Sequence, residues 1–204
     1  MSASTVRTIF AFDTATSRTS CALLRDGELL GERITEARAV LAAADELVRE
    51  AGLRPSEIDA LVVGTGPGSF TGVRMGLATA RGLALALDVP VAGVSTLAAL
   101  AAGAPGALPV IDAKRREVFT LLDGEPRVLA PQEVPLEAGR VCVGDGATRY
   151  RALLEERGAV VLPDDDERHL PRARFHVTLA GEARPVDELE PLYLRVPDAD
   201  RNTP

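Results

Sequence analysis

The spacing of hydrophobic positions changes several times along the chain, and each spacing predicts one kind of element. Near the N-terminus, short apolar runs at residues 6–13, 20–25 and 28–34 alternate with polar turns. Asp26-Gly27, between the second and third run, is a hairpin signal. This part of the chain therefore predicts three strands.

From residue 36 to 52 the period becomes helical. Ala37, Val40, Leu41, Ala44 and Leu47 fall on one face, with charged residues opposite. A buried-strand pattern follows, ending at a glycine-rich loop, and a second helix is predicted over 73–88. The next strand leads into a short helix that Ser95 or Thr96 caps.

After residues 103–106 (GAPG) the opening order returns. PVID, a turn, VFTLL and Asp123-Gly124 repeat FAFD, a turn, SCALL and Asp26-Gly27. Such duplication is an organisational signal. We therefore predict two lobes, residues 1–103 and a smaller lobe at 104–204. We expect residues 163–185 to be mostly irregular and the end of the Pro-rich tail to pack back on the body from Leu192 to Val196.

Composition excludes several classes of protein. A net charge of −7, a single lysine and 3% aromatic residues are unlike a nucleic-acid binder, although Lys114, Arg115 and Arg116 form a local basic exception. Cys21 and Cys142 are isolated within apolar runs, which indicates buried thiols. With neither a signal peptide nor an apolar run long enough to cross a membrane, we expect a cytoplasmic protein.

The glycine loop GTGPGSFTGVRMG fits none of three catalytic templates. It has no Walker lysine, no Gly-x-Gly-x-x-Gly frame, and no glycines two residues either side of a serine. Two interpretations stay open: a structural turn that sets helix packing, and direct contact with a phosphate at the helix start. The residues concerned are Gly66, Gly68, Ser69, Thr71 and Gly72.

Asp13 ends a strand and precedes Thr14, so these two are candidate nucleotide contacts, or else form a local turn. His169 and His176 lack metal-ligand spacing, and we expect both on the surface. The sequence therefore predicts no metal site and no catalytic residue.

Small residues recur every fourth position in the second helix, at Gly76, Ala80 and Ala84. This stripe can pack on the chain's own sheet, or it can admit a helix of a partner. Ala43, Ala78 and Leu85 lie outside the helix faces expected to pack on the sheet, so they are apolar residues that a partner can contact. The candidate partner surface comprises Ala37, Val40, Leu41, Ala44, Val73, Gly76, Leu77, Ala80 and Ala84.

Several segments together resemble the bacterial TsaB (YeaZ) family: FAFDTATSRTSCALL, VVGTGPGSFTGVRMGLATARGLALAL, VAGVSTLAAL, IDAKRREVF and PLYLR, in this order. The resemblance covers residues 8–196. It implies an α/β fold of the actin, sugar kinase and heat-shock chaperone ATPase superfamily, with two ribonuclease-H-like lobes of mixed sheets, the second reduced. Residues 36–38 (Glu-Ala-Arg) depart from the His-Ser-Glu-like start that relatives often have.

The resemblance also implies a function in making threonylcarbamoyladenosine in tRNA. The TsaB-like protein is expected to be a non-catalytic subunit that pairs with its paralogue TsaD, with a small ATPase, TsaE, docking on the pair. Self-association through the same two helices is implied too, with tRNA contacted only indirectly. No intrinsic cofactor is expected, although ATP or ADP can lie at the interface of the assembled complex. The alternative is a small ATPase or kinase of the same superfamily.

Overall fold

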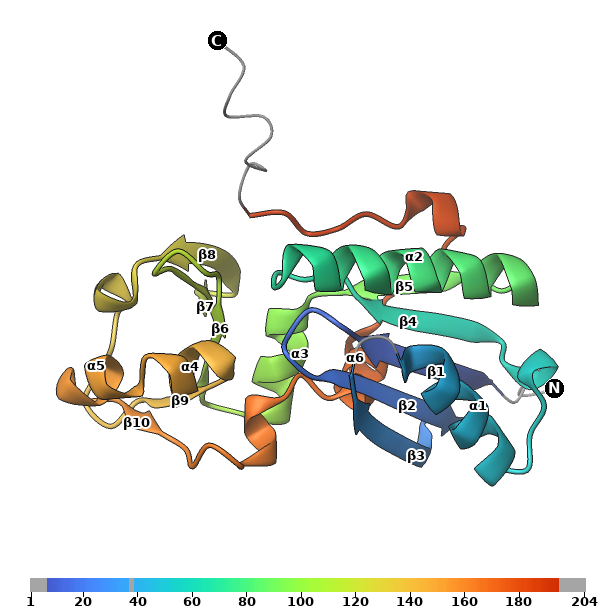
Figure 1. Cartoon of the computed structure of the whole chain (residues 1–204), viewed down its shortest axis with the longest axis horizontal. Coiled ribbons are helices and arrows are strands. Elements are labelled where there is room, and N and C mark those ends of the chain that lie inside the picture. Colours follow the sequence, from blue (N-terminus) through green and yellow to red (C-terminus); the bar gives the residue numbers. More distant parts are fainter. Residues whose placement is uncertain (1–6, 37–38, 195–204) are drawn as a thin grey trace, which may run out of the picture.

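The computed structural model describes residues 7–36 and 39–194. They form two α/β lobes that lie next to each other along the long axis of the molecule (Figure 1). Among these residues, no helix combines the length and apolar character that crossing a membrane requires.

The first lobe holds a mixed five-stranded sheet in the order β3-β2-β1-β4-β5. The central strand β1 is antiparallel to β2 and parallel to β4. Its elements are β1 (Thr8–Asp13), β2 (Thr19–Arg25), β3 (Glu28–Thr35), α1 (Val40–Glu50), the 3-10 turn η2 (Pro55–Glu57), β4 (Ala60–Gly64), α2 (Phe70–Leu87), β5 (Val91–Val94) and α3 (Thr96–Gly103).

The second lobe repeats this topology, with strand order β10-β9-β6-β7-β8. The duplication predicted from the sequence is thus confirmed by the sheets. The elements are β6 (Leu108–Asp112), β7 (Val118–Leu122), β8 (Glu125–Leu129), η3 (Pro131–Glu133), β9 (Val141–Val143), α4 (Asp145–Arg149), α5 (Arg151–Glu156), β10 (Val160–Val161), η4 (Glu167–His169), α6 (Ala173–Leu179) and η5 (Val186–Glu188). The lobe is reduced, because η3 stands where the first lobe has α1.

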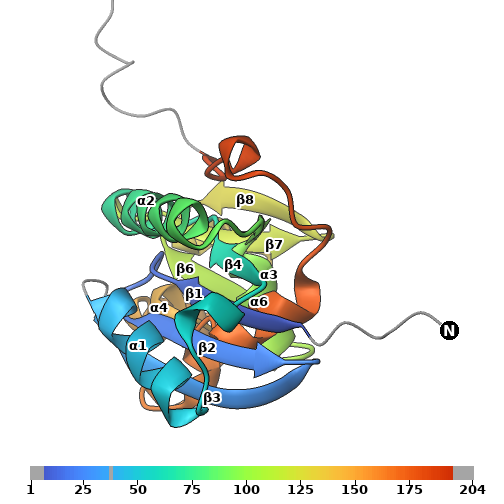
Figure 2. The same cartoon turned by 90° about the vertical axis from the view of Figure 1, so that its right-hand side faces the viewer.

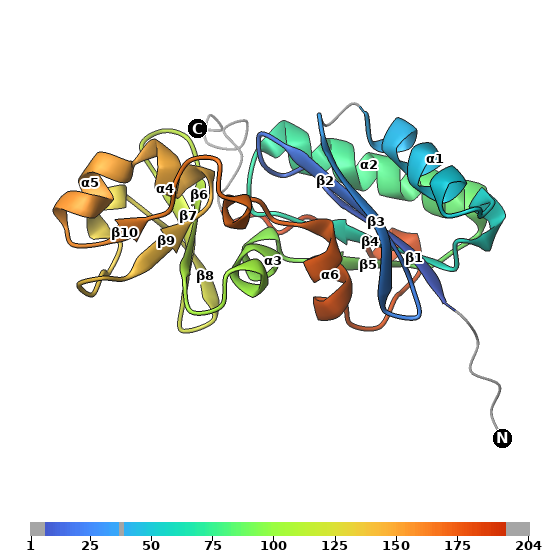
Figure 3. The same ribbon diagram turned by 90° about the horizontal axis from the view of Figure 1, so that it is seen from below.

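Helices cover both faces of the first sheet. On one face α1 and α2 pack over Phe10, Phe12 and Leu61, and on the other α6 covers Ala11 and Val62 (Figure 3). Burying apolar side chains on both faces is the main stabilising contribution to such a sheet.

The last helix of each lobe packs on the sheet of the other lobe. From α3, Leu97 and Leu100 join Ile111 and Phe119 in the core of the second lobe. In return, α6 contacts β1, β2 and β4 of the first lobe. Residues 163–185 are mostly irregular, as expected, but two helical segments that the sequence analysis did not predict, η4 and α6, lie within them. The boundary predicted at 103/104 falls between α3 and β6, but α6 lies on the first lobe despite its place in the sequence.

Residues 180–194, which we call the C-terminal strap, run from α6 past the edge strand β5 and then beside α2 (Figures 1 and 2). Arg184 makes an isolated antiparallel bridge to Val91, and the Leu192 amide donates to the Thr65 carbonyl at 2.9 Å. Leu192 thus packs back on the body as predicted, whereas Val196 lies outside the described residues.

Candidate functional site

The glycine loop joins β4 to α2 and lies directly against the end of β1. The Ser69 side chain caps α2 by accepting from the Gly72 amide, and the Ser69 amide donates to the Ala15 carbonyl at 2.7 Å. A Cβ atom at Gly68 would lie 2.3 Å from the Ala15 carbonyl oxygen, and one at Gly72 would lie 2.2 Å from the Thr14 carbonyl oxygen. Glycine at these positions allows the loop to approach the β1 turn. Gly66 has a φ of +93°, which glycine adopts without strain.

The carboxylate of Asp13 is enclosed beneath this loop. The side chain is buried, and Oδ1 accepts from the Ala15 amide at 2.7 Å. Oδ2 lies 2.7 Å from both Thr96 Oγ1 and His176 Nε2. Each carboxylate oxygen is therefore held by groups of the chain itself, from the β1 turn, α3 and α6.

These contacts correct two expectations. Asp13 and Thr14 are both 1% exposed, and Thr14 Oγ1 donates to the Gly72 carbonyl, so neither side chain is placed to contact a nucleotide. His176 is fully buried against Asp13, and buried His169 accepts at Nδ1 from the Gly144 amide, so neither histidine is the surface residue predicted.

The stripe of small residues in α2 faces inward. Ala80 is fully buried, and Gly76 packs so closely on Thr14 that an added Cβ would lie 2.3 Å from its hydroxyl oxygen. The partner surface expected from the sequence is corrected accordingly. Six of its members are buried in the chain's own structure, namely Val40, Val73, Gly76, Leu77, Ala80 and Ala84.

Of the remaining members, Leu41 is 58% exposed and Ala44 is half-buried, while Ala37 lies outside the described residues. Ala43 is buried as well, so it leaves no material for a partner.

The outward side of α2 carries a second row of small and apolar residues. Ala78, Gly82 and Ala86 recur every fourth position and are exposed, and Leu85 beside them is 75% exposed. We call these four residues the outer face of α2. An added Cβ at Gly82 would meet no atom within 4 Å.

Charge is nearly absent from this helix. Its sequence holds two charged residues, Arg74 and Arg81, and both bond to the C-terminal strap. Arg74 Nε donates to the Tyr193 hydroxyl, and Arg81 Nη2 donates to the Leu189 carbonyl, each at 2.9 Å. The four residues of the outer face are therefore uncharged and exposed among the described residues, and exposed apolar surface of this kind is characteristic of interaction sites.

Comparison with known proteins decides the family. A family model described as TsaD, tRNA N6-adenosine threonylcarbamoyltransferase, matches residues 36–136. The Escherichia coli protein named tRNA threonylcarbamoyladenosine biosynthesis protein TsaB is 35% identical over 92% of this chain and 94% of its own length. The structure of YeaZ from Pseudomonas aeruginosa matches with a TM-score of 0.76 and 34% identity, covering 92% of this chain and 100% of that one. The chain belongs to the TsaB (YeaZ) family.

Membership in the TsaB family confirms the resemblance seen in the sequence, and the two five-stranded mixed sheets of matching strand order confirm the expected α/β fold of two similar lobes. A short stretch is also similar to a transferase. The tRNA N6-adenosine threonylcarbamoyltransferase of Nitratidesulfovibrio vulgaris is 51% identical over 29% of this chain and 17% of its own length. This chain is thus similar in part of its sequence to the transferase family whose model matches residues 36–136.

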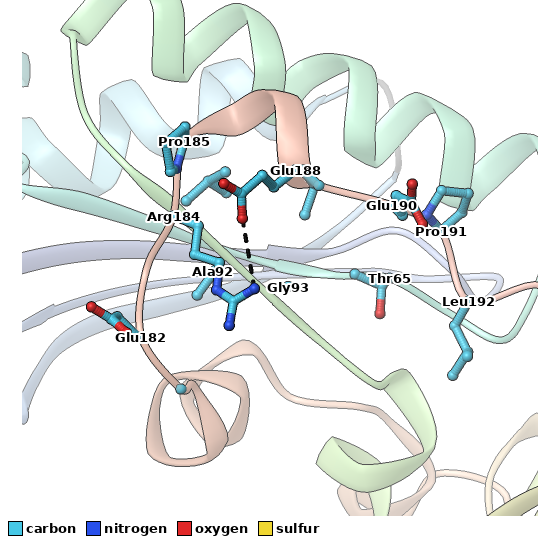
Figure 4. Close-up of a pocket in the computed structure, with 13 residues that line it drawn as sticks. Thr65, Ala92, Gly93, Glu182, Arg184, Pro185, Glu188, Glu190, Pro191 and Leu192 are labelled. Atoms are coloured by element: carbon cyan, nitrogen blue, oxygen red, sulfur yellow. Dashed lines mark ion pairs between the residues drawn. The ribbon is translucent and has the colours of Figure 1, made fainter.

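A pocket of about 530 Å³ lies between β5 and the C-terminal strap (Figure 4). Arg184 and Glu188 point toward each other there, 3.6 Å apart, and Glu182 and Glu190 add further carboxylates. Such an acidic lining repels phosphate groups. Every residue that the sequence proposed for a site lies outside this lining.

The second lobe holds a counterpart of Asp13. Asp112 ends β6 and accepts at Oδ1 from the amide two residues further on, that of Lys114, as Asp13 does from Ala15. Its Oδ2, however, faces the cations of Lys114 and Arg149 at 2.7 and 3.3 Å. Asp145 accepts from the Asp112 amide, and burial is the main cause that raises the pKa of Asp145.

The two thiols behave as the sequence predicted. Both are buried and free, and burial raises the pKa of Cys21 to about 12, with help from the negative charge of Glu32, and that of Cys142 to about 11. A thiol that stays protonated is a poor nucleophile. Within residues 7–36 and 39–194, no cluster of three or more His, Cys, Asp or Glu side chains is arranged to hold a metal ion.

The sequence analysis did not predict that α6 is a helix, nor that it packs on the first sheet and brings His176 to Asp13. This helix docks through polar contacts: Arg172 pairs with buried Glu32 at 2.6 Å, and the Ala173 amide donates to Ser20 Oγ at 2.8 Å. A signal was available in Ala173, Val177 and Ala180, whose spacing is helical. The surrounding prolines and charges obscured it.

Proposed function

We propose that this TsaB-family chain serves tRNA threonylcarbamoyladenosine biosynthesis as a non-catalytic subunit that binds a TsaD-like paralogue. The outer face of α2 forms the contact, together with exposed Leu41 of α1, a helix that packs on the same face of the sheet. The names of the E. coli relative and of the matching TsaD model support the pathway.

The observation that carries the proposal is the contrast between the two sides of the glycine loop. Inside, Asp13 is enclosed by Thr96 and His176, which leaves its carboxylate without a free oxygen for a metal ion or a nucleotide. Outside, the helix that the loop starts presents Ala78, Gly82 and Leu85 to solvent. Small residues on a helix let another helix approach closely, because the interaxial distance depends on the side chains at the contact.

A paralogue is a suitable partner for this face because it shares the local sequence of the region. The TsaD model matches residues 36–136, which span α1 and α2. A second copy of this chain would offer the same face, so self-association competes with the paralogue. A TsaE-like ATPase, ATP or ADP held between the assembled subunits, and a cytoplasmic location complete the proposal.

The test substitutes arginine on either side of α2. Gly82→Arg adds a bulky cation where the structure has open space, so the monomer should stay folded. We expect its affinity for the TsaD-like paralogue to fall at least about tenfold, which corresponds to about 1.4 kcal/mol. Gel filtration and calorimetric titration of the purified pair measure this.

Ala152→Arg on α5, an exposed helical alanine of the second lobe, is the matched control and should bind like the parent. Ala80→Arg, by contrast, should prevent folding, because Ala80 is fully buried. Undiminished binding of Gly82→Arg would reject the surface, and threonylcarbamoylation of tRNA by this chain alone would reject the non-catalytic role.

A further inference from the structure

A charged surface lies in the second lobe, apart from the outer face of α2. The turn between β6 and β7 carries Lys114, Arg115 and Arg116, all exposed, and Arg149 of α4 lies beside it. We call these four residues the basic turn. In a chain of net charge −7, they gather four cations at one place, including the only lysine.

Two of these cations share one carboxylate oxygen as their partner. Lys114 Nζ and Arg149 Nη1 lie 2.7 and 3.3 Å from the same oxygen, Asp112 Oδ2. Their side chains remain 68% and 58% exposed, whereas that of Asp112 is 4% exposed. The carboxylate therefore anchors the cations from below and leaves their outer sides open to solvent.

The backbone of the turn is unusual. Lys114, Arg115 and Arg116 have φ values of 61°, 52° and 62°, so three consecutive non-glycine residues are left-handed. Side chains other than glycine adopt this conformation at a cost, and clusters of such residues are associated with functional sites. The fold maintains this conformation through the Glu117 amide, which donates to the Lys114 carbonyl at 2.9 Å.

We propose that the basic turn binds backbone phosphates of the RNA substrate when this chain is part of its complex, an inference that rests on the proposed function. RNA fits better than an acidic protein, since phosphates recur at every nucleotide and reward several cations on a short turn. Arg149 also lies 5.8 Å from the ring of half-buried Tyr150, which adds an aromatic surface. The contact recognises charge and contributes no chemistry to the transfer.

The experiment compares two charge reversals in the second lobe. Arg116→Glu changes the basic turn, and Arg140→Glu, an exposed residue at the opposite end of the same sheet, gives the same change in net charge. Each variant is assembled with the TsaD-like paralogue, and the affinity for a substrate tRNA transcript is measured by fluorescence anisotropy in 50 and 200 mM salt.

We expect Arg116→Glu to weaken tRNA binding by roughly tenfold in 50 mM salt, and Arg140→Glu to leave it within about twofold. Arg116→Ala should lower the salt slope by about 0.9, the value for one lost phosphate contact. Equal affinities of the two reversed variants would overturn the inference while leaving the proposed function intact.

Two further outcomes are informative. If Arg116→Glu weakens assembly with the paralogue but not the tRNA affinity of the complex that forms, the turn contacts protein and the RNA assignment is overturned. If even the parent chain does not join the paralogue, the proposed function fails by itself. In that case the tRNA titration is repeated with the isolated chain in low salt. Equal affinities of Arg116→Glu and Arg140→Glu would then overturn the inference.

Discussion

Two glycines of α2 should respond in opposite directions to the same substitution. Gly72 and Gly82 both lie in this helix, but Gly72 faces the β1 turn and Gly82 faces solvent. Replacing each by alanine adds one methyl group and reduces the conformational entropy of the unfolded chain. A difference in stability between the two variants therefore comes from the atoms that surround the added methyl group.

The magnitudes follow from the space at each position. At Gly82 nothing lies within 4 Å of an added Cβ, so the substitution should stabilise by about 0.8–1 kcal/mol, the helix-propensity difference. At Gly72 the Cβ would lie 2.2 Å from the Thr14 carbonyl oxygen, a backbone atom that cannot rotate away. Overpacking of this kind costs about 1–3 kcal/mol, more than the propensity gain.

Thermal unfolding measures both effects. For a chain of this size 1 kcal/mol corresponds to a shift in Tm of about 2–4 °C. Gly82→Ala should raise the Tm by a few degrees and Gly72→Ala should lower it, each at a protein concentration where the chain is monomeric. An unchanged or higher Tm for Gly72→Ala would refute the argument that close approach to the β1 turn requires glycine there.

Two other predictions concern buried polar groups. His176→Ala removes a donor to the enclosed Asp13 carboxylate and leaves a cavity, so we expect a loss of about 3 kcal/mol in unfolding free energy, while Thr178→Ala on the exposed side of α6 should change little. A denaturant titration in which the two variants match would contradict this. Burial raises the pKa of Asp145, so its charged form opposes folding above that pKa; Asp145→Asn keeps an acceptor for the Asp112 amide and should raise the Tm at pH 7. The gain should shrink as the pH falls through the raised pKa of folded Asp145 and vanish below the usual Asp pKa of about 3.9, where the folded and unfolded parent are both protonated. A gain independent of pH would contradict the assignment.

Much of the fold could be predicted from the sequence because local rules agree with the tertiary structure there. The hairpin at Asp26-Gly27 and its repeat at Asp123-Gly124 fall between strands in both lobes. The cap at Ser69 also lies where a polar side chain precedes the helical period. These signals depend on a few neighbouring residues, and a single sequence contains them.

The sides of α2 could not be assigned in the same way. Ala80 and Gly82 are both small, and the helical period places them on different sides without stating which side meets the sheet. The network around Asp13 was hidden for a related reason. His176 and Asp13 are separated by 163 positions, and nothing local in the chain indicates that they meet.

Because α6 follows the second lobe in sequence but packs on the sheet of the first lobe, the first lobe cannot complete its folding early in translation. One face of the first sheet is covered by α6, which begins at Ala173, so about 170 residues must leave the ribosome before that face finds its cover. Domains of a nascent chain generally fold as units while they emerge from the ribosome, the N-terminal domain first. The first sheet of this chain must wait, with one apolar face uncovered, until α6 has been synthesised. A stop codon before α6 should therefore yield an aggregating fragment, even though all five strands of the first sheet are present.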